Sequence, residues 1–410
     1  MLMNAPHDNP PRDNPPRYGI WLVGARGGVA TSAIVGLAAL RGRLTTETGL
    51  VGGLPEFAKL PFVSWERLVV GGHEIRDLTL IEAAEQLHRE SRVFSAEMLA
   101  ACQSDLESAD KNIRPGILWN VGDTIRRLAS NSASTDLSPR ESIEALQKDL
   151  TEFRERHRLD DVIVVNLAST EATLDQSLWP ATWGETQVLL DEPDCPLPAS
   201  SLYAIAALDL GIPYINFTPS LGAAPTGIDE LARKRGTCHA GCDAKTGETL
   251  LKSVLAPMFA ARNLEIMSWV GHNIFGNLDG QVLDDPSNKA SKVLSKDHLL
   301  EQILGYAPQT LVSIEHIRSL GDWKTAWDHV HFRGFLETPM TLQLTWQGCD
   351  SLLAAPLVLD LVRFALVARG RGETGALTFL SSFFKSPLGT ENQAFFEQTA
   401  SLVSWARRSS

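Results

Sequence analysis

The sequence predicts an α/β fold in which a doubly wound parallel sheet carries an inserted α+β unit. Short apolar segments recur along the chain, and each ends in small or polar residues before a helical pattern begins, which is typical of parallel strands joined by helices. The first of these segments runs directly into a glycine-rich turn. Beyond Trp269 the segments alternate polar and apolar residues, as antiparallel strands do. A chain of 410 residues is longer than a single hydrophobic core usually accommodates, so two structural units are expected.

The composition is that of a globular protein, with 44% hydrophobic and 21% charged residues. A net charge of −12 argues against a nucleic-acid partner but leaves an anionic substrate open, because a local cluster of lysines decides that. No apolar run is expected to span a bilayer, so no membrane partner is predicted. Five cysteines form an odd, sparse set that fits a reducing cytoplasm. Cys238, His239 and Cys242 match no standard zinc spacing, so no metal is expected.

Residues 1–17 are expected to form a disordered tail. The tract Asp-Asn-Pro-Pro-Arg occurs twice, at Asp8–Arg12 and Asp13–Arg17. Such a segment cannot bury enough apolar surface to fold, so the folded part should begin at Tyr18.

The glycine-rich turn suggests a dinucleotide-binding loop in a Rossmann-like domain. An apolar strand, Tyr18–Val23, is followed by Gly24-Ala-Arg-Gly-Gly-Val-Ala30 and then by a helix over 31–40. Glycines let the backbone approach a pyrophosphate, and the helix N-terminus offers it free N–H groups. Arg26 and Val29 stand where the usual pattern has its second and third glycines, and an ordinary strand-to-helix turn is the alternative. The candidate cofactor residues here are Gly24, Arg26, Gly27, Gly28 and Val29.

A second strand, Leu68–Val70, is followed by Gly71-Gly-His-Glu74 and by helices over 78–90 and 96–110. Glu74 is a candidate acceptor for the ribose hydroxyls, and in that position it would favour NAD over NADP. A solvated turn carboxylate is the alternative interpretation.

The clearest buried strand is Asp161–Asn166, after a charged helix over 140–158. It ends in Leu167-Ala-Ser-Thr-Glu171, where ligands of doubly wound sheets bind, so Ala168, Ser169 and Thr170 are candidate cofactor residues. A helix over 200–210, a strand over 214–217 and a polar loop over 218–226 repeat the pattern. Residues 241–247 form another loop, in which Asp243, Lys245 and Thr246 are either surface residues or ligand contacts.

The stretch from Trp269 to Lys296 reads as a polar, glycine-punctuated loop followed by a helix. Lys292 and Lys296 stand four residues apart, so they share a face and repel each other unless an anion lies between them. A solvated helix face is the alternative. Beyond it we predict a strand over 310–314, a turn over 321–324, and antiparallel segments over 330–336 and 340–346.

The domain division follows from these patterns. Residues 18–266 and 350–410 have α/β character and should form one discontinuous NAD-binding domain. Residues 267–349 should form a catalytic and oligomerisation insert. Asp350 and Ser351 are either cofactor contacts or the start of a helix, since Asp and Ser are good N-caps.

Several motifs, in order along nearly the whole chain, resemble the myo-inositol-1-phosphate synthase (inositol-3-phosphate synthase) family. Asn273–Gly280 is similar to Asn-His-Leu-Gly-Asn-Asn-Asp-Gly, and Ser291–Lys296 to Ser-Lys-x-x-Ser-Lys. Gly321–Ala326 resembles Gly-Asp-Ser-Lys-x-Ala, and Cys349–Pro356 resembles Cys-Glu-Asp-Ser-Leu-Leu-Ala-Ala-Pro. Lys385 lies in a match to Thr-Lys-Ala-Pro-Leu. Spaced matches in order are far more specific than one glycine motif.

The chain also departs from the family pattern. Gly24–Ala30 replaces Gly-Trp-Gly-Gly-Asn-Asn-Gly, and Gly72–Glu74 replaces Gly-Trp-Asp. Ile274 and Leu278 replace a His and an Asn in the central loop. These departures leave NAD binding in place and open the identity of the substrate.

The resemblance implies a cytoplasmic homotetramer that converts D-glucose 6-phosphate to myo-inositol 1(3)-phosphate, at the head of inositol and phospholipid biosynthesis. C5 is oxidised by hydride transfer to NAD, C6 is deprotonated, the enolate attacks C1, and C5 is reduced again. Lysines suit these steps as donors and proton carriers. The resemblance implies a catalytic set of Lys292, Lys296, Lys324, Lys385, Asp322 and Asn273, and further NAD contacts at Asn277, Asp279, Asp350 and Ser351.

The individual roles are expected as follows. Lys292, Lys324 and Lys385 serve the C1 and C5 oxygens and proton transfer, Lys296 serves the phosphate or an oxyanion, and Asp322 orients a lysine or the nicotinamide side. Three alternatives stay open: the same chemistry on another sugar phosphate, such as a ketose phosphate giving a five-membered carbocycle; a non-catalytic NAD-binding oligomer; and a simple NAD-dependent dehydrogenase.

Overall fold

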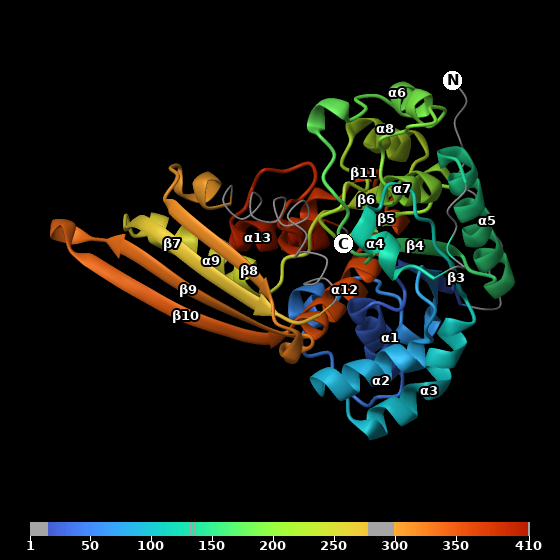
Figure 1. Cartoon of the computed structure of the whole chain (residues 1–410), viewed down its shortest axis with the longest axis horizontal. Coiled ribbons are helices and arrows are strands. Elements are labelled where there is room, and N and C mark those ends of the chain that lie inside the picture. The colour runs from blue at the N-terminus through green and yellow to red at the C-terminus, as the bar shows by residue number, and fades with distance from the viewer. Residues whose placement is uncertain (1–14, 131–132, 134–136, 278–298, 409–410) are drawn as a thin grey trace.

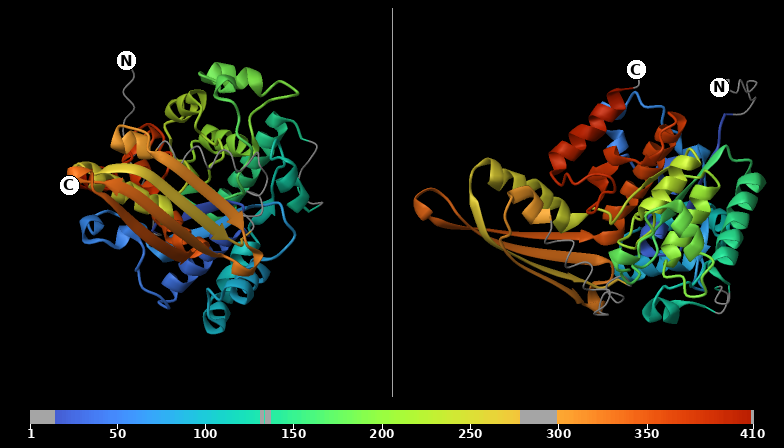
Figure 2. Two further views of the ribbon diagram at one scale, coloured as in Figure 1. Left: turned by 60° about the vertical axis from the view of Figure 1, so that its left-hand side comes forward. Right: turned by 90° about the horizontal axis from the view of Figure 1, so that it is seen from above.

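The computed structural model describes residues 15–130, 133, 137–277 and 299–408. Its strands form two sheets, one of seven strands and one of four. Figures 1 and 2 show the seven-stranded sheet inside a body of helices, from which the four-stranded sheet extends as an elongated lobe. The α/β class and the presence of a second sheet agree with the sequence prediction.

The seven-stranded sheet is parallel throughout, in the order β11-β6-β5-β4-β1-β2-β3. Strand β1, which lies between β4 and β2, is buried on both faces because helices cover the sheet from both sides. Ile20 and Leu22 enter one hydrophobic core, and Trp21 and Val23 enter the other. The strands are β1 (Tyr18–Val23), β2 (Leu68–Glu74), β3 (Ile113–Pro115), β4 (Asp161–Asn166), β5 (Tyr214–Asn216), β6 (Cys238–Ala240) and β11 (Gly375–Ala376).

Helices fill both layers around this sheet, and side-chain caps mark where several of them begin. Thr79 and Ser138 each accept a hydrogen bond from the backbone three residues on, and a Glu closes the capping box. One layer contains α1 (Gly28–Arg41), α2 (Leu80–Ser91), α3 (Ala96–Asp110), α12 (Asp350–Gly370) and α13 (Phe395–Arg407). The other contains α4 (Asp123–Leu128), α5 (Pro139–His157), α7 (Ala199–Asp209) and α8 (Thr226–Lys234), with α6 (Trp183–Leu189) against α8. Short 3-10 turns lie at Val51–Gly53, Pro55–Phe57, Trp65–Arg67, Gln176–Leu178, Arg318–Leu320, Phe335–Glu337 and Thr378–Phe383.

The four-stranded sheet has the order β10-β9-β7-β8. β9 runs antiparallel to both neighbours, as expected, but β7 and β8 are parallel, which the sequence analysis did not anticipate. Helix α9 covers one face, where Phe259, Trp269 and Val330 form a separate core. The elements are α9 (Gly247–Ala261), β7 (Glu265–Phe275), β8 (Gln309–His316), β9 (Trp323–Arg333) and β10 (Pro339–Cys349).

Two segments expected to be loops are strands instead. Gly71–Glu74 continues β2, where Gly72 N–H and Glu74 O pair the strand with the β3 edge. Trp269–Phe275 belongs to β7. Trp269 is buried in the core that α9 covers, and Phe275 is buried where β7 ends at the cavity described below. In both cases the glycines and polar residues suggested a loop, while tertiary burial stabilises a strand.

The N-terminal segment and helix α12 also differ from expectation. Residues 1–14 lie outside the described residues, but Arg17, assigned to the tail, is held by a hydrogen bond from its N–H to Asp160 Oδ2 (2.9 Å). Helix α12 is long and apolar enough to cross a membrane by length and composition alone, contrary to the expectation that no segment would be. Within the fold, 72% of its apolar window is buried, and it packs along α1 as a core helix.

Candidate active site

The carboxyl ends of the parallel strands open into a cavity of about 880 Å³. Its lining comes from the β1–α1 turn, the end of β2, the segments after β4 and β5, the end of β7, the start of β9 and the start of α12. Both sheets therefore contribute to one cavity, whose volume lies within the roughly 300–1,000 Å³ typical of small-molecule and cofactor sites.

The β1–α1 turn presents backbone rather than side chains to the cavity. Gly24 has a positive φ of 79°, and a Cβ there would lie 3.0 Å from Ala168 Cα, so glycine is required. The N–H groups of Gly24 and Ala25 donate to His73 O on β2 (2.9 and 3.0 Å), which holds the turn against the sheet. Helix α1 begins after Gly27 with no side-chain cap, so its first N–H groups are open to a ligand. An uncapped helix N-terminus behind a glycine turn fits a pyrophosphate.

Glu74 lies at the cavity wall but is already heavily hydrogen-bonded. Its carboxylate accepts from the N–H groups of Arg26 (2.9 Å), Ile75 (2.9 Å) and Arg76 (3.1 Å), and from the Arg76 guanidinium. Burial opposes its ionisation, but the charge and hydrogen bonds of Arg76 and the backbone bonds hold the pKa of Glu74 below its usual range. The carboxylate thus shapes the glycine turn, a task that the sequence analysis did not foresee.

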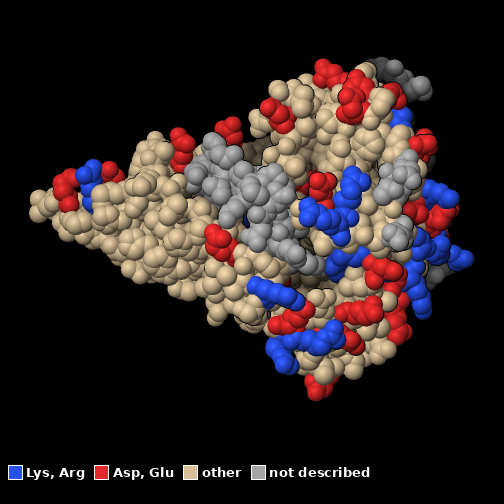
Figure 3. All heavy atoms as spheres, viewed as in Figure 1, with Lys and Arg blue, Asp and Glu red and all other residues tan. Residues whose placement is uncertain are grey.

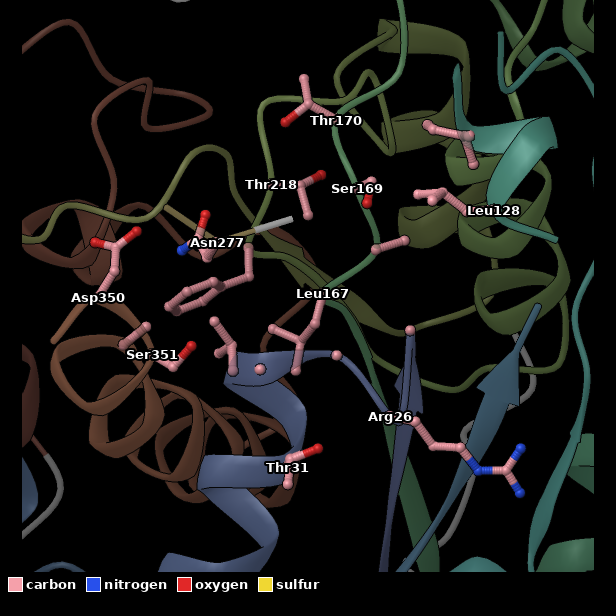
Figure 4. Close-up of a pocket in the computed structure, with 18 of the residues that line it drawn as sticks. Arg26, Thr31, Leu128, Leu167, Ser169, Thr170, Thr218, Asn277, Asp350 and Ser351 are labelled. Atoms are coloured by element: carbon pink, nitrogen blue, oxygen red, sulfur yellow. The ribbon is translucent and has the colours of Figure 1, made fainter. Parts of the chain in front are cut away.

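Next to Glu74 the cavity has an apolar wall. Ile75, Ile117, Val121, Ile125 and Leu128 line it, following β2 and β3 and on α4. This surface suits a flat, apolar ring system such as adenine. Figure 4 shows Arg26 and Leu128 on one side of the N-terminus of α1, and Asn277, Asp350 and Ser351 on the other.

At the end of the cavity that contains Asn277 and Ser351, Asp322 connects three segments of the chain through hydrogen bonds. It is 3% exposed, and it accepts hydrogen bonds from Ser351 N (2.8 Å), Ser351 Oγ (2.9 Å), Cys349 Sγ (2.8 Å) and Asn277 Nδ2 (3.2 Å). Burial raises the pKa of Asp322. Lys324 lies nearby, with its Nζ 3.9 Å from Asp350 Oδ1 and 5.2 Å from the ring centre of Phe275.

Lys385 lines the cavity from the segment that follows β11, and its Nζ donates to Asp243 Oδ1 (2.7 Å). Lys245 is buried beside this pair, and its Nζ donates to Gln398 Oε1 (2.7 Å). Burial, together with the charge of Lys385, lowers the pKa of Lys245 to about 7. Lys245 does not line the cavity, so the structure gives it no direct contact with a ligand there.

The structure brings most of the predicted site residues to this one cavity, but not all. Asn273 is buried in β7 rather than in a loop; it is outside the cavity lining, and its side-chain atoms have no hydrogen-bond partner among the described residues. Asp279, Lys292 and Lys296 lie outside the described residues. The predicted residues that line the cavity are Gly24, Arg26, Gly27, Gly28, Val29, Glu74, Ala168, Ser169, Thr170, Asp243, Thr246, Asn277, Asp322, Lys324, Asp350, Ser351 and Lys385.

Sequence reasoning missed several polar lining residues. Ser91 ends α2, and its Oγ accepts from Asp322 N (2.8 Å), which connects α2 to the end of the cavity that contains Asp322. Glu171 accepts from Ser200 N (2.9 Å) at the start of α7, and burial raises its pKa to about 7. Arg76 is the third, at the end of β2. Only Glu171 carried a signal, because it ends the polar segment after β4; the Ser91 contact with Asp322 joins residues distant in sequence, whereas Arg76 pairs with Glu74, two residues before it.

Comparison with known proteins agrees with this geometry. The family model for myo-inositol-1-phosphate synthase, a NAD-binding family, matches residues 18–407. An inositol-3-phosphate synthase of Bacteroides thetaiotaomicron is 30% identical over 91% of this chain and 90% of its own length. A relative of the same name from Spirodela polyrhiza is 28% identical over 80% of this chain and 67% of its own length.

Solved structures give the same result. Inositol-3-phosphate synthase from Caenorhabditis elegans superposes with a TM-score of 0.84 and 25% identity, covering 96% of this chain and 86% of the other. A myo-inositol-1-phosphate synthase-related protein from Thermotoga maritima shares the fold, with a TM-score of 0.78 and 23% identity over 95% of this chain and 98% of the other. The chain therefore belongs to the myo-inositol-1-phosphate synthase family, isomerases built on a Rossmann-like NAD-binding domain.

Proposed function

We propose that this chain cyclises D-glucose 6-phosphate to myo-inositol 1(3)-phosphate with no net redox change. C5 is oxidised, C6 loses a proton, the resulting enolate attacks C1, and C5 is reduced again. The observation that carries the proposal is the convergence of two separate segments, one with Asp322 and Lys324 and the other with Lys385, on the cavity that also contains the glycine turn. A phosphorylated sugar that develops oxyanions needs such cationic donors in a site shielded from water.

The cofactor would lie along the sheet edge. The turn at Gly24–Gly28 and the open N-terminus of α1 suit the pyrophosphate, and the apolar wall near Leu128 suits adenine. The nicotinamide would then lie toward Asn277 and Ser351, at the end where the lysines are. When bound, NAD supplies the hydride acceptor at C5 and returns the hydride there.

The lysines divide the proton chemistry. Lys324 donates to an oxyanion at C1 or C5, and Asp350 Oδ1 lies 3.9 Å from its Nζ. Lys385 serves proton transfer at C5 and C6, and Asp243 orients its Nζ at 2.7 Å. Asp322 holds Ser351 and Asn277 toward the nicotinamide side. Lys292 and Lys296 complete the set for the phosphate and the second oxyanion.

Incubation with glucose 6-phosphate and NAD, followed by phosphorus NMR, tests this proposal. An inositol phosphate signal without accumulating NADH supports it. A product from a ketose phosphate alone would favour a five-membered carbocycle, accumulating NADH would indicate a simple dehydrogenase, and NAD binding without any product would indicate a non-catalytic oligomer.

We further propose that residues 267–349 form a unit for self-association, apart from the discontinuous domain of 18–266 and 350–410. On the face of the sheet turned away from α9, the ring of Trp327 stacks on His272 with centroids 5.7 Å apart, and the neighbouring Leu311 is 55% exposed. Figure 3 shows few charged side chains over this lobe, as at an oligomer interface. A cytoplasmic tetramer is our proposal; all five cysteines are free thiols, which fits that compartment.

A further inference from the structure

Two guanidinium groups flank the adenosine end of the cavity. Arg26 belongs to the glycine turn and Arg76 follows the end of β2, and both line the cavity. Arg26 Nη1 donates to the backbone O of Arg76 (3.5 Å), so the Arg26 guanidinium lies against the backbone that follows β2. In a sheet of this order, the residues at the end of β2 lie next to the ribose of the adenosine.

Each guanidinium is fixed by a carboxylate along one edge. Arg76 donates through Nε to Glu74 Oε1 (3.2 Å) and through Nη2 to Glu74 Oε2 (3.1 Å), and Arg26 donates through Nε to Asp110 Oδ1 (2.9 Å). A guanidinium carries five N–H donors in a planar fork. Nη1 of Arg76 and Nη2 of Arg26 have no hydrogen-bond partner among the described residues, so donors remain for a further anion.

The cations face the cavity more than their carboxylate partners do. The side chain of Arg76 is 19% exposed and that of its partner Glu74 is 3% exposed, whereas Arg26 is 17% exposed and its partner Asp110 is 23% exposed. Asp110 lies outside the cavity lining, where it also accepts from Leu80 N (3.1 Å). An anion entering through the cavity therefore meets guanidinium groups first, already oriented at no further cost in side-chain entropy.

We infer that the cavity accepts NADP as well as NAD, with Arg76 and Arg26 binding the 2′-phosphate on the adenosine ribose. This inference rests on the placement of the adenosine proposed above. An unpaired ribose carboxylate rejects NADP, whereas an arginine beside the ribose accommodates its phosphate, and here Arg76 both neutralises Glu74 and supplies the donor. The inference reverses the NAD preference expected from Glu74 in the sequence.

Calorimetric titration of the full chain with NAD and with NADP tests the inference. The measured quantity is the ratio of the NADP to the NAD dissociation constant, because a general loss of binding cancels in a ratio. In the wild type we expect a ratio below about ten. Arg76→Gln should raise the ratio by about tenfold or more, since it removes a charge-assisted hydrogen bond. Glu74→Gln should lower it, because it removes the one buried carboxylate beside the phosphate.

Arg89→Gln is the matched control. Arg89 lies on α2, is 64% exposed and pairs with Glu85. It does not line the cavity, so the ratio of the NADP to the NAD dissociation constant should not change in this variant. If Arg76→Gln does not fold, competition on the wild-type chain replaces it: 2′,5′-ADP should displace NAD at a lower concentration than AMP does. A wild-type ratio above about ten, or 2′,5′-ADP no better than AMP, overturns the inference. Neither result depends on catalysis, so a failure to form inositol phosphate would reject the proposed reaction alone.

Discussion

At the scale of single residues, the site is a set of charges that hold one another in place. Asp322 joins β9, α12 and the end of β7, Asp243 orients Lys385, and Lys245 lies behind that pair with a pKa lowered to about 7. Such perturbed lysines are characteristic of sites that move protons near neutral pH. These features support the proposal that the cluster combines binding of an anion with proton transfer.

Lys385→Ala is the first prediction at this scale. Loss of the ammonium group should reduce turnover of glucose 6-phosphate by roughly 10²–10⁴-fold, the usual contribution of a proton-transfer group. NAD affinity should stay nearly unchanged, because Lys385 is assigned to the sugar. Product formation by phosphorus NMR and NAD titration measure the two effects. Lys148→Ala, at a lysine 75% exposed on α5, is the control; full activity of Lys385→Ala would remove this lysine from the catalytic set.

At the scale of elements, the β1–α1 turn and the pairing of β1 with β2 form the part of the cavity that we propose holds the cofactor. Gly28 begins α1, and a Cβ there would lie 2.6 Å from Ser351 Oγ, which is hydrogen-bonded to Asp322. Trp21 on β1 donates to His73 Nδ1 on β2 (2.8 Å), and His73 Nε2 donates to Asp149 (3.1 Å). The turn and the strand pair are therefore coupled to the site by specific contacts.

Gly28→Ala should weaken NAD binding by about tenfold or more, because the methyl group displaces Ser351 and crowds the pyrophosphate position. Gly36→Ala, in the same helix with no atom within 4 Å of the added Cβ, is the matched control. The control should bind NAD normally and raise the free energy of unfolding by about 0.5–1 kcal/mol. Equal NAD affinity in both variants would contradict the role of the turn.

His73 should make the fold less stable in acid. Burial lowers its pKa, despite the hydrogen bond that His73 donates to Asp149, which acts in the opposite direction. Below about 6.5, the ordinary pKa, the unfolded chain binds a proton that the folded chain resists, so the free energy of unfolding falls as pH falls. Urea unfolding at pH 5.5 and 7.5 measures this, and the fall should be smaller in His73→Gln. An unchanged pH dependence in that variant would show that other groups cause it.

The sequence predicts these elements unevenly, and the reasons are physical. Strands such as β4 are apolar on both faces, and helices such as α5 have caps and an amphipathic pattern. Both can therefore be predicted from the local sequence. β7 was missed in part because its glycine and asparagine disfavour a strand, and only packing against α9 and β9 stabilises one. The site's lysines came from motif resemblance, whereas Ser91 acts through Asp322, a partner distant in sequence that no local pattern reveals.

At the scale of the whole molecule, the chain returns from the four-stranded sheet through α12 to the seven-stranded sheet. α12 begins directly after Cys349 and packs on α1, so both sheets meet at the cavity. Figure 2 shows the four-stranded sheet projecting away from the helical body. Among the described residues, the face turned away from α9 is the surface that we propose for a second copy of the chain.

Trp327→Glu should shift the protein to smaller species in light scattering after size exclusion, because a charge would be buried in the proposed interface. Val188→Glu is the control, since Val188 is 61% exposed on α6 in the helical body. An unchanged mass in Trp327→Glu, with a wild type larger than one chain, would place the interface elsewhere.

The most direct test of the proposed reaction uses glucose 6-phosphate labelled with deuterium at C5. If the hydride removed from C5 returns to the same carbon, the inositol phosphate retains the label, and NADH does not accumulate. Proton and phosphorus NMR of the product, with NAD absorbance in the same sample, measure both quantities. Retention of deuterium in a cyclic product is the predicted result; loss of the label to solvent, accumulation of labelled NADH, or absence of a cyclic product would contradict the account.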